Sequence, residues 1–349
     1  MATDTAFALA GLGGFNAHGA GFLQAARDNG VRPHLATVTS GQILVLAAFL
    51  EGEPDLRAGL IDRAAADNPF AQLQVALFGY PGVFRPAYAE TLARLAQPPR
   101  FTDSLVDIFA DRLLPAQQYV PARPDAAIEA VAATFNGSDV GVVFNAYDPT
   151  SGQGVLYGND AARARLQSRT AIPLSAVNRP RGSRYAKADG QESPLLAIDA
   201  EAIKSALWLS LYGFERLPGG RMDGAYHRAC IVSELHSFSR LIVARPLANG
   251  WANAPPPRSW FDVQDWQCEM WFSAGYKAEV DALLHINQLI EDGVITDPRF
   301  RRVEFHEVAP DTPAGYFNFF VEREPVFRAA YAEADALFKR LAAAGNRGP

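Results

Sequence analysis

Residues 5–50, TAFALAGLGGFNAHGAGFLQAARDNGVRPHLATVTSGQILVLAAFL, decide the fold of this chain. Two short apolar runs, Thr5 to Ala10 and His34 to Thr39, are typical of buried parallel strands. Each is followed by a helical pattern, over Gly19 to Asn29 and over Gln42 to Leu50. Strand, helix, strand and helix in succession predict a βαβ unit with a right-handed crossover. We therefore expect an α/β protein, a three-layer α/β/α sandwich with a mostly parallel sheet and helices on both faces.

The rest of the chain alternates in a similar way. Residues 55–135 predict mainly helix with Pro and Gly breaks, and Asp139 to Tyr147 with Gly154 to Tyr157 predict a buried strand and a hairpin. Later patterns predict helices over Ile198 to Tyr212, Ala278 to Ile290 and Glu324 to Ala343, and strands over Ser239 to Ala244 and Arg302 to His306. A Pro- and Asn-rich stretch, Asn249 to Pro257, marks a boundary. We expect a catalytic α/β domain over residues 1–248 and a C-terminal accessory region over 249–349, packed at one edge.

Composition limits the class of protein. The 349 residues are 49% hydrophobic and 20% charged, which is an ordinary globular balance. The net charge is −6 and no Lys- or Arg-rich run is dense enough for a nucleic-acid patch, so nucleic acid is not expected as a partner. No apolar run has the length of a membrane span and no signal peptide pattern is found, so we expect a cytoplasmic protein. Cys230 and Cys268 are isolated, which argues against a zinc site or a disulfide framework.

A glycine-rich turn, Gly11-Leu12-Gly13-Gly14, joins the first strand to the first helix. Glycines there allow a tight turn and bring backbone N–H groups close to an anion. That anion is either a dinucleotide pyrophosphate or the oxyanion of a tetrahedral intermediate. A dinucleotide site needs an acidic residue about twenty positions further on, and Arg32-Pro33-His34-Leu35 holds none. The oxyanion interpretation is favoured, and a plain connecting turn is the third alternative.

Ser40 lies between the second strand and the second helix, within Thr37-Val38-Thr39-Ser40-Gly41-Gln42. On such a turn the hydroxyl is exposed at the positive end of the helix dipole, although Thr-Ser-Gly is also a common helix N-cap. A serine nucleophile needs a base within hydrogen-bonding distance. Asp223, in Met222-Asp223-Gly224-Ala225, can be that base if its loop is rigid, and we expect Gly224 to permit an unusual backbone angle beside it.

The order of these motifs is informative: glycine loop, helix, strand, serine elbow, helix, and an Asp-Gly-Ala after the glycine turn Pro218-Gly219-Gly220-Arg221. Over about residues 6–247 this order resembles the patatin-like phospholipase family, and VVFNAYDPTSGQGVLY (142–157) resembles a strand of that family. The resemblance implies a Ser–Asp dyad of Ser40 and Asp223, with Leu12, Gly13 and Gly14 as the oxyanion hole. The region after residue 250 is similar to the accessory region of some bacterial members.

The same resemblance implies a serine acyl-ester hydrolase of the lipase or phospholipase A type. Its substrate would be a lipid or another acyl ester, met at a membrane, droplet or polyester granule surface, and no metal or organic cofactor is implied. The elbow departs from the usual Gly-x-Ser-x-Gly, because Val38 and Gln42 require a wider turn or shifted packing. Phe15 and Asn16 stand where the family's loop carries Arg or Lys. The alternative is a catalytically weak or inactive lipid- or partner-binding protein.

Further candidates for the site depend on single features. His18 follows the glycine loop and His227 follows the Asp-Gly turn, so either histidine could lie close to Ser40. A Ser-His-Asp triad therefore stays an alternative to the dyad. Pro69 to Phe84 is amphipathic and predicts either core packing or a lid. An apolar set with two interpretations, a tertiary core contact or the lining of an acyl channel, comprises Trp266, Met270, Trp271, Phe272, Phe317, Phe319 and Phe320.

Overall fold

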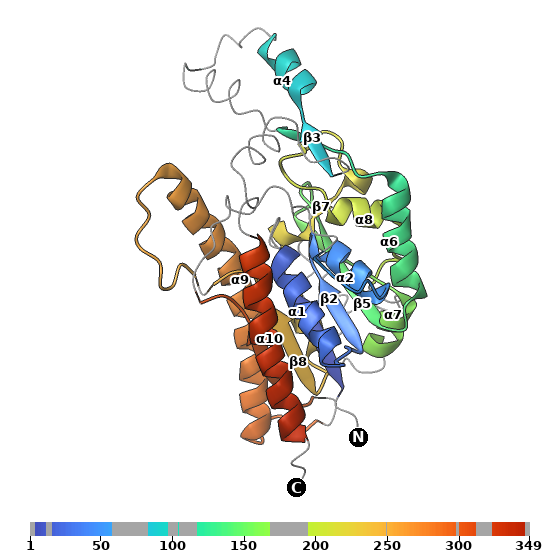
Figure 1. Ribbon diagram of the computed structural model, residues 1–349, viewed down its shortest axis with the longest axis vertical. Coiled ribbons are helices and arrows are strands. Elements are labelled where there is room, and N and C mark those ends of the chain that lie inside the picture. The colour runs from blue at the N-terminus through green and yellow to red at the C-terminus, as the bar shows by residue number, and fades with distance from the viewer. Residues whose placement is uncertain are drawn as a thin grey trace.

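The computed structural model describes residues 4–11, 16–57, 83–96, 104, 117–167, 195–248, 250–297, 300–311 and 323–345. Its central sheet has the strand order β6-β5-β2-β1-β8-β9, with β7 paired to β5, and Figure 1 labels β2, β5, β7 and β8 of this sheet. Neighbours among β5, β2, β1, β8 and β9 are parallel, whereas β6 and β7 are antiparallel to β5. The strands are β1 (Thr5–Leu9), β2 (Leu35–Val38), β5 (Gly141–Asp148), β6 (Gln153–Gly158), β7 (Met222–Asp223), β8 (Arg240–Ala244) and β9 (Glu304–Val308). The chain is therefore an α/β protein with a mostly parallel mixed sheet, as the sequence predicts.

Helices cover both faces of this sheet. Successive strand residues point to opposite faces, so Phe7 and Leu9 enter one core cluster while Ala6 and Ala8 enter the other. The first cluster is covered by α1 (Asn16–Asp28), α2 (Gln42–Leu50), α6 (Asp125–Gly137), α8 (Ala200–Ala206) and α10 (Arg323–Gly345). The second is covered by α7 (Asp160–Gln167) and α9 (Trp260–Glu291). The three-layer sandwich follows from these two cores.

Two helices differ in length from the sequence-based expectation. Helix α8 ends at Ala206, because the Trp208 carbonyl beyond it accepts a hydrogen bond from the Asp223 N–H at 3.0 Å. Helix α9 begins at Trp260 instead of near Ala278. Its start is fixed by a capping box in which Ser259 and Asp262 satisfy each other's backbone N–H groups. No described helix is long and apolar enough to cross a membrane.

The C-terminal residues contribute to the same sheet and cores. Strand β9 extends the sheet by parallel pairing with β8. Helix α10 lies along α1 (Figure 1), and its Phe338 packs on Phe7 and Phe22 with ring centroids 6.2 and 5.6 Å apart. A side chain at Gly21 of α1 would lie 2.3 Å from the Phe327 carbonyl oxygen, so glycine lets the two helices approach closely. The division of the chain after residue 248 stays a prediction.

A smaller unit lies apart from the sheet. Strands β3 (Phe84–Pro86) and β4 (Tyr119–Pro121) pair antiparallel, with the Phe84 and Tyr119 rings edge to face at 4.9 Å. Helix α4 (Tyr88–Leu95) follows β3. In the described part of residues 55–135, the helices α4 and α6 are accompanied by the short strands β3 and β4, and β4 ends at the predicted break, Pro121. The rest of this predicted helical stretch lies outside the described residues.

Candidate active site

The serine elbow lies at the carboxyl end of β2, where the parallel strands β1 and β2 stop side by side. Ser40 has a φ of 58°, one of the few non-glycine residues with left-handed backbone in the described chain. The turn is held by hydrogen bonds from the Thr39 N–H to the Leu9 carbonyl at 3.2 Å and from the Ile43 N–H to the Ser40 carbonyl at 3.0 Å. A left-handed serine costs about 1–2 kcal/mol, and such strained residues cluster at functional sites. The turn therefore presents the hydroxyl at the start of α2.

Glycines flank this turn for steric reasons. A Cβ on Gly11 would lie 2.2 Å from the Thr39 carbonyl oxygen and 2.7 Å from the Ser40 Cβ. A Cβ on Gly41 would lie 2.3 Å from the Asn16 Oδ1 atom. The two ends of the glycine-rich loop, Gly11 and Asn16, thus pack directly against the elbow.

The departures at Val38 and Gln42 are accommodated by neighbouring elements. The buried Gln42 side chain lies over Gly19 of α1, where a Cβ would meet its Oε1 atom at 1.9 Å. Val38 is fully buried in the core cluster beneath α1 and α2. A glycine on the facing helix therefore supplies the space that a glycine at position 42 would otherwise provide.

Strand register brings Asp223 to the elbow. Val38 is level with Phe144 on β5, and two residues further along β5 Ala146 pairs with Asp223 of β7. Ser40, two residues beyond Val38, is therefore at the same level as Asp223. The Ser40 hydroxyl donates a hydrogen bond to the Asp223 Oδ2 atom. The other carboxylate oxygen accepts from the Ala225 N–H at 2.8 Å. The structure thus brings together two predicted site residues that are 183 positions apart.

Burial controls the electrostatics of this pair. Both side chains are almost fully buried, and burial raises the pKa of Asp223 to about 7, against the hydrogen bonds from Ser40 and Ala225. Two phenols in the described chain, Tyr212 and Tyr226, are close enough to feel the charge of Asp223. Burial raises the pKa of Tyr212 to about 12 and also raises the pKa of Tyr226, so both stay neutral at pH 7. A carboxylate with a pKa near 7 can both accept and return a proton at neutral pH.

The turn after Asp223 is held by side chains that sequence reasoning did not single out. The amide of Asn145 on β5 donates to the Gly224 and Arg228 carbonyls at 3.1 and 2.8 Å. A Cβ on Gly224 would lie 2.2 Å from the Asn145 Cγ atom. Gly224 does not have a positive φ, so the expected unusual backbone angle is wrong. Glycine is needed there because Asn145 packs against it.

The histidines do not mediate between the serine and the aspartate, which are in direct contact. His18 is buried in α1, where burial and the Arg245 charge lower its pKa to about 3 and keep it neutral. His227 stacks on Tyr147 with ring centroids 5.8 Å apart. Ser40 and Asp223 therefore form a directly hydrogen-bonded pair.

Several predicted residues lie outside the described chain. These are Leu12, Gly13, Gly14 and Phe15 of the glycine-rich loop, all of Pro69 to Phe84 except its last two residues, and Phe317, Phe319 and Phe320. Of the apolar set on α9, Trp266, Met270 and Trp271 are exposed, whereas Phe272 is buried beside Ala225. Among the described residues no three His, Cys, Asp or Glu side chains are grouped as metal ligands.

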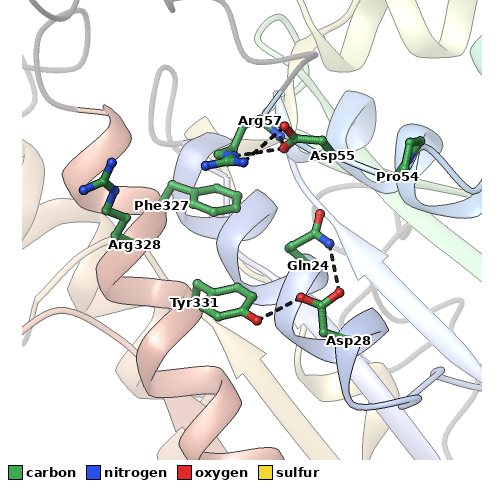
Figure 2. Close-up of a pocket in the computed structure, with 8 residues that line it drawn as sticks. All are labelled: Gln24, Asp28, Pro54, Asp55, Arg57, Phe327, Arg328 and Tyr331. Atoms are coloured by element: carbon green, nitrogen blue, oxygen red, sulfur yellow. Dashed lines mark hydrogen bonds and ion pairs between the residues drawn. The ribbon is translucent and has the colours of Figure 1, made fainter.

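A pocket of about 480 Å³ lies away from the elbow, between α1, α10 and residues 54–57 (Figure 2). It is near Asp28, at the end of α1 opposite Asn16. The Asp28 carboxylate accepts hydrogen bonds from Tyr331 at 2.8 Å and Gln24 at 3.0 Å. Arg57 pairs with Asp55 at 3.0 Å. None of the residues that line this pocket belongs to the elbow or to the turn after Asp223, so the pocket is separate from the site around Ser40.

Comparisons with known proteins add little to this picture. No protein-family model matches the sequence, and no curated protein matches it. Among solved structures, VipD from Legionella pneumophila is similar over 97% of this chain and 67% of VipD, at 12% identity and a TM-score of 0.36. The case for function therefore depends on the geometry of Ser40 and Asp223.

Proposed function

We propose that this protein is a serine acyl-ester hydrolase of the patatin-like type, with Ser40 as nucleophile and Asp223 as general base. The observation that carries the proposal is the hydrogen bond between two buried side chains, the Ser40 hydroxyl and the Asp223 carboxylate. The serine is on a strained strand-to-helix turn, and the aspartate is the acceptor with a pKa near 7. Nucleophilic catalysis requires a nucleophile, a base within hydrogen-bonding distance and a turn that holds the nucleophile in place, and the site has all three.

In this mechanism the ionised Asp223 accepts the Ser40 proton as Oγ attacks the ester carbonyl carbon. Collapse of the tetrahedral intermediate breaks the bond to the alkoxy leaving group, which takes the proton from Asp223. Water then attacks the acyl-serine carbonyl carbon and gives a proton to the same carboxylate. Collapse of this second intermediate breaks the bond to Ser40 Oγ, which takes the proton back from Asp223, and the carboxylic acid product leaves. Each step needs one group at a fixed place that first accepts a proton and then returns it, and the directly bonded Asp223 carboxylate supplies that group.

Stabilisation of the oxyanion is assigned to backbone N–H groups of Leu12, Gly13 and Gly14. Support comes from the two ends of their loop, since Gly11 packs on Ser40 and Asn16 packs on Gly41. The Gly11 N–H itself donates to the Ala229 carbonyl at 2.9 Å and is not a donor for substrate. One such donor contributes about 3 kcal/mol to the transition state.

The substrate class follows from the dyad and from the family resemblance: a lipid or another acyl ester, with lipase or phospholipase A activity, in the cytoplasm or at a membrane or granule surface. The departures at Val38 and Gln42 do not weigh against turnover, because Gly19 provides space for Gln42. The position and contacts of Ser40 and Asp223 favour hydrolysis over binding alone.

Hydrolysis of p-nitrophenyl esters across chain lengths tests the proposal, together with labelling by a fluorophosphonate probe. The wild type should be labelled once, and Ser40→Ala should lose both labelling and hydrolysis. Labelling that persists in Ser40→Ala would assign the nucleophile to another residue. Absence of labelling and hydrolysis in a folded wild type would favour a lipid- or partner-binding protein.

The oxyanion assignment has its own test. Replacing Gly13 by Val should lower kcat by about 10²- to 10³-fold, since the donors act on charge that exists only in the transition state. KM should change much less. An unchanged kcat in a folded Gly13→Val variant would exclude this loop from the oxyanion hole.

A further inference from the structure

Asn145 lies on β5 beside the point where the strand pairs with Asp223. Its neighbour Ala146 is the residue paired with Asp223. The Asn145 side chain is 2% exposed, and its amide nitrogen donates to the carbonyls of Gly224, at 3.1 Å, and Arg228, at 2.8 Å. Both partners are acceptors, so the nitrogen and not the oxygen must face them. One amide thus spans the turn that follows Asp223.

This turn is also anchored at its far end. Arg228 forms a bidentate ion pair with Glu234 at 2.8 and 2.7 Å, and its Nε donates to Glu279 of α9 at 2.6 Å. Its near end is fixed by the Asp223 carboxylate, which accepts from the Ala225 N–H. Asn145 is the side chain between these anchors, in contact with the Cα of Gly224.

We propose that Asn145 is a positioning residue, which holds the turn from Asp223 to Arg228 so that the carboxylate stays on the Ser40 hydroxyl. This inference rests on the proposed hydrolase function. Loss of the amide removes the donor that Asn145 supplies to the half-buried Arg228 carbonyl and one of the donors to the Gly224 carbonyl, which keeps the His227 and Arg228 N–H groups. The turn then loses its side-chain link to β5, and this favours its rearrangement. A misplacement of about 1 Å at a reacting group can lower a rate by about 10²-fold.

The chain provides a matched control in Asn159. Its side chain also clamps buried backbone: Nδ2 donates to the Phe135 and Val140 carbonyls at 2.8 and 2.9 Å, and Oδ1 accepts from the Val142 N–H at 2.9 Å. These bonds lie at the start of β5, about 13 Å along the strand from Ala146. Asn159 Oδ1 also accepts from the Ala162 N–H at 2.9 Å, so Asn159→Ala removes more buried hydrogen bonds than Asn145→Ala does, and removes them away from Asp223.

The experiment compares Asn145→Ala and Asn159→Ala in ester hydrolysis, at a temperature where circular dichroism shows both folded. We expect Asn145→Ala to lower kcat by about 10- to 100-fold with little change in KM, as supporting residues around catalytic groups do. The midpoint of its pH–rate profile should fall below that of the wild type, because a released Asp223 gains solvent. Asn159→Ala should keep kcat and the midpoint while losing stability.

A second readout does not depend on turnover. Asp223→Asn removes a buried ionisable carboxylate. The change that it causes in the free energy of unfolding, measured with urea at pH 8.5, therefore reports how firmly Asp223 is held in its buried site. When Asp223→Asn is made in the Asn145→Ala protein, this change in free energy should be less than half of the change in the wild type. In the Asn159→Ala protein it should equal the change in the wild type. If the wild type shows no Ser40-dependent hydrolysis, the proposed function fails and this comparison alone decides the role of Asn145. Equal behaviour of Asn145→Ala and Asn159→Ala in every readout would overturn the inference.

Discussion

Replacing Asp223 by Asn tests the electrostatics of the dyad through stability as well as activity. The carboxylate is 1% exposed, and the substitution keeps its shape while removing its charge. The amide oxygen can still accept from the Ala225 N–H, and the amide nitrogen can donate to the Ser40 hydroxyl. The variant therefore retains the contacts of the site and loses only its ionisation.

The magnitude follows from the pKa of this group. Burial raises it from 3.8 to about 7, and at 1.36 kcal/mol per pKa unit this corresponds to about 4 kcal/mol. The folded chain then binds more protons than the unfolded chain between about pH 4 and pH 7, so stability falls as the pH rises through this window. The contribution of the protonated group is fully present below about pH 4 and lost above about pH 7. Asp223→Asn lacks this dependence and should exceed the wild type in stability at alkaline pH.

Urea unfolding at pH 4.5 and pH 8.5 measures the effect, because all other titrating groups are shared by the two proteins. We expect free energies of unfolding within about 1 kcal/mol of each other at pH 4.5, and Asp223→Asn more stable by about 2–4 kcal/mol at pH 8.5. Ester hydrolysis should fall by about 10³-fold or more in the same variant. A stability difference that is the same at both pH values would refute the account of Asp223 as a buried base with a raised pKa.

Three other outcomes are expected. The kcat/KM of the wild type should rise with pH and level off above an apparent pKa of about 7, since only ionised Asp223 accepts the Ser40 proton; a profile flat from pH 5 to 9 would contradict this. Ser40→Gly should be more stable to urea than Ser40→Ala by about 1 kcal/mol, because glycine adopts a φ of 58° without strain, and equal stabilities would mean that the elbow relaxes. Gly11→Val should lower hydrolysis by about 10²-fold, because its Cβ would sit 2.2 Å from the Thr39 carbonyl oxygen and displace the elbow. Gly137→Ala, where a Cβ meets nothing within 4 Å, is the control for Gly11→Val and should leave activity unchanged.

Local pattern in the sequence determined most of the sheet and the elbow. The apolar runs and glycines of residues 5–50 predict β1, α1, β2 and α2, and the observed α2 has the bounds expected from sequence. Such elements are predictable because strand and helix periodicity and glycine stops act over a few residues. Ser40 could be singled out for the same reason, since a serine between a buried strand and an apolar helix is a local feature.

Other features were decided by contacts between distant parts of the chain. The two-residue strand β7 has no pattern of its own and exists because β5 offers a free edge beyond the end of β2. The space for Gln42 is made by Gly19 on another helix. The clamp from Asn145 to Gly224 joins residues 79 positions apart, and nothing in the local sequence of Asn145 distinguishes it from Asn159. Sequence periodicity reports which face of an element is buried, but the partner of a buried polar group is fixed only when the strands are in register. The tertiary structure alone therefore determined which residues hold Asp223 against Ser40.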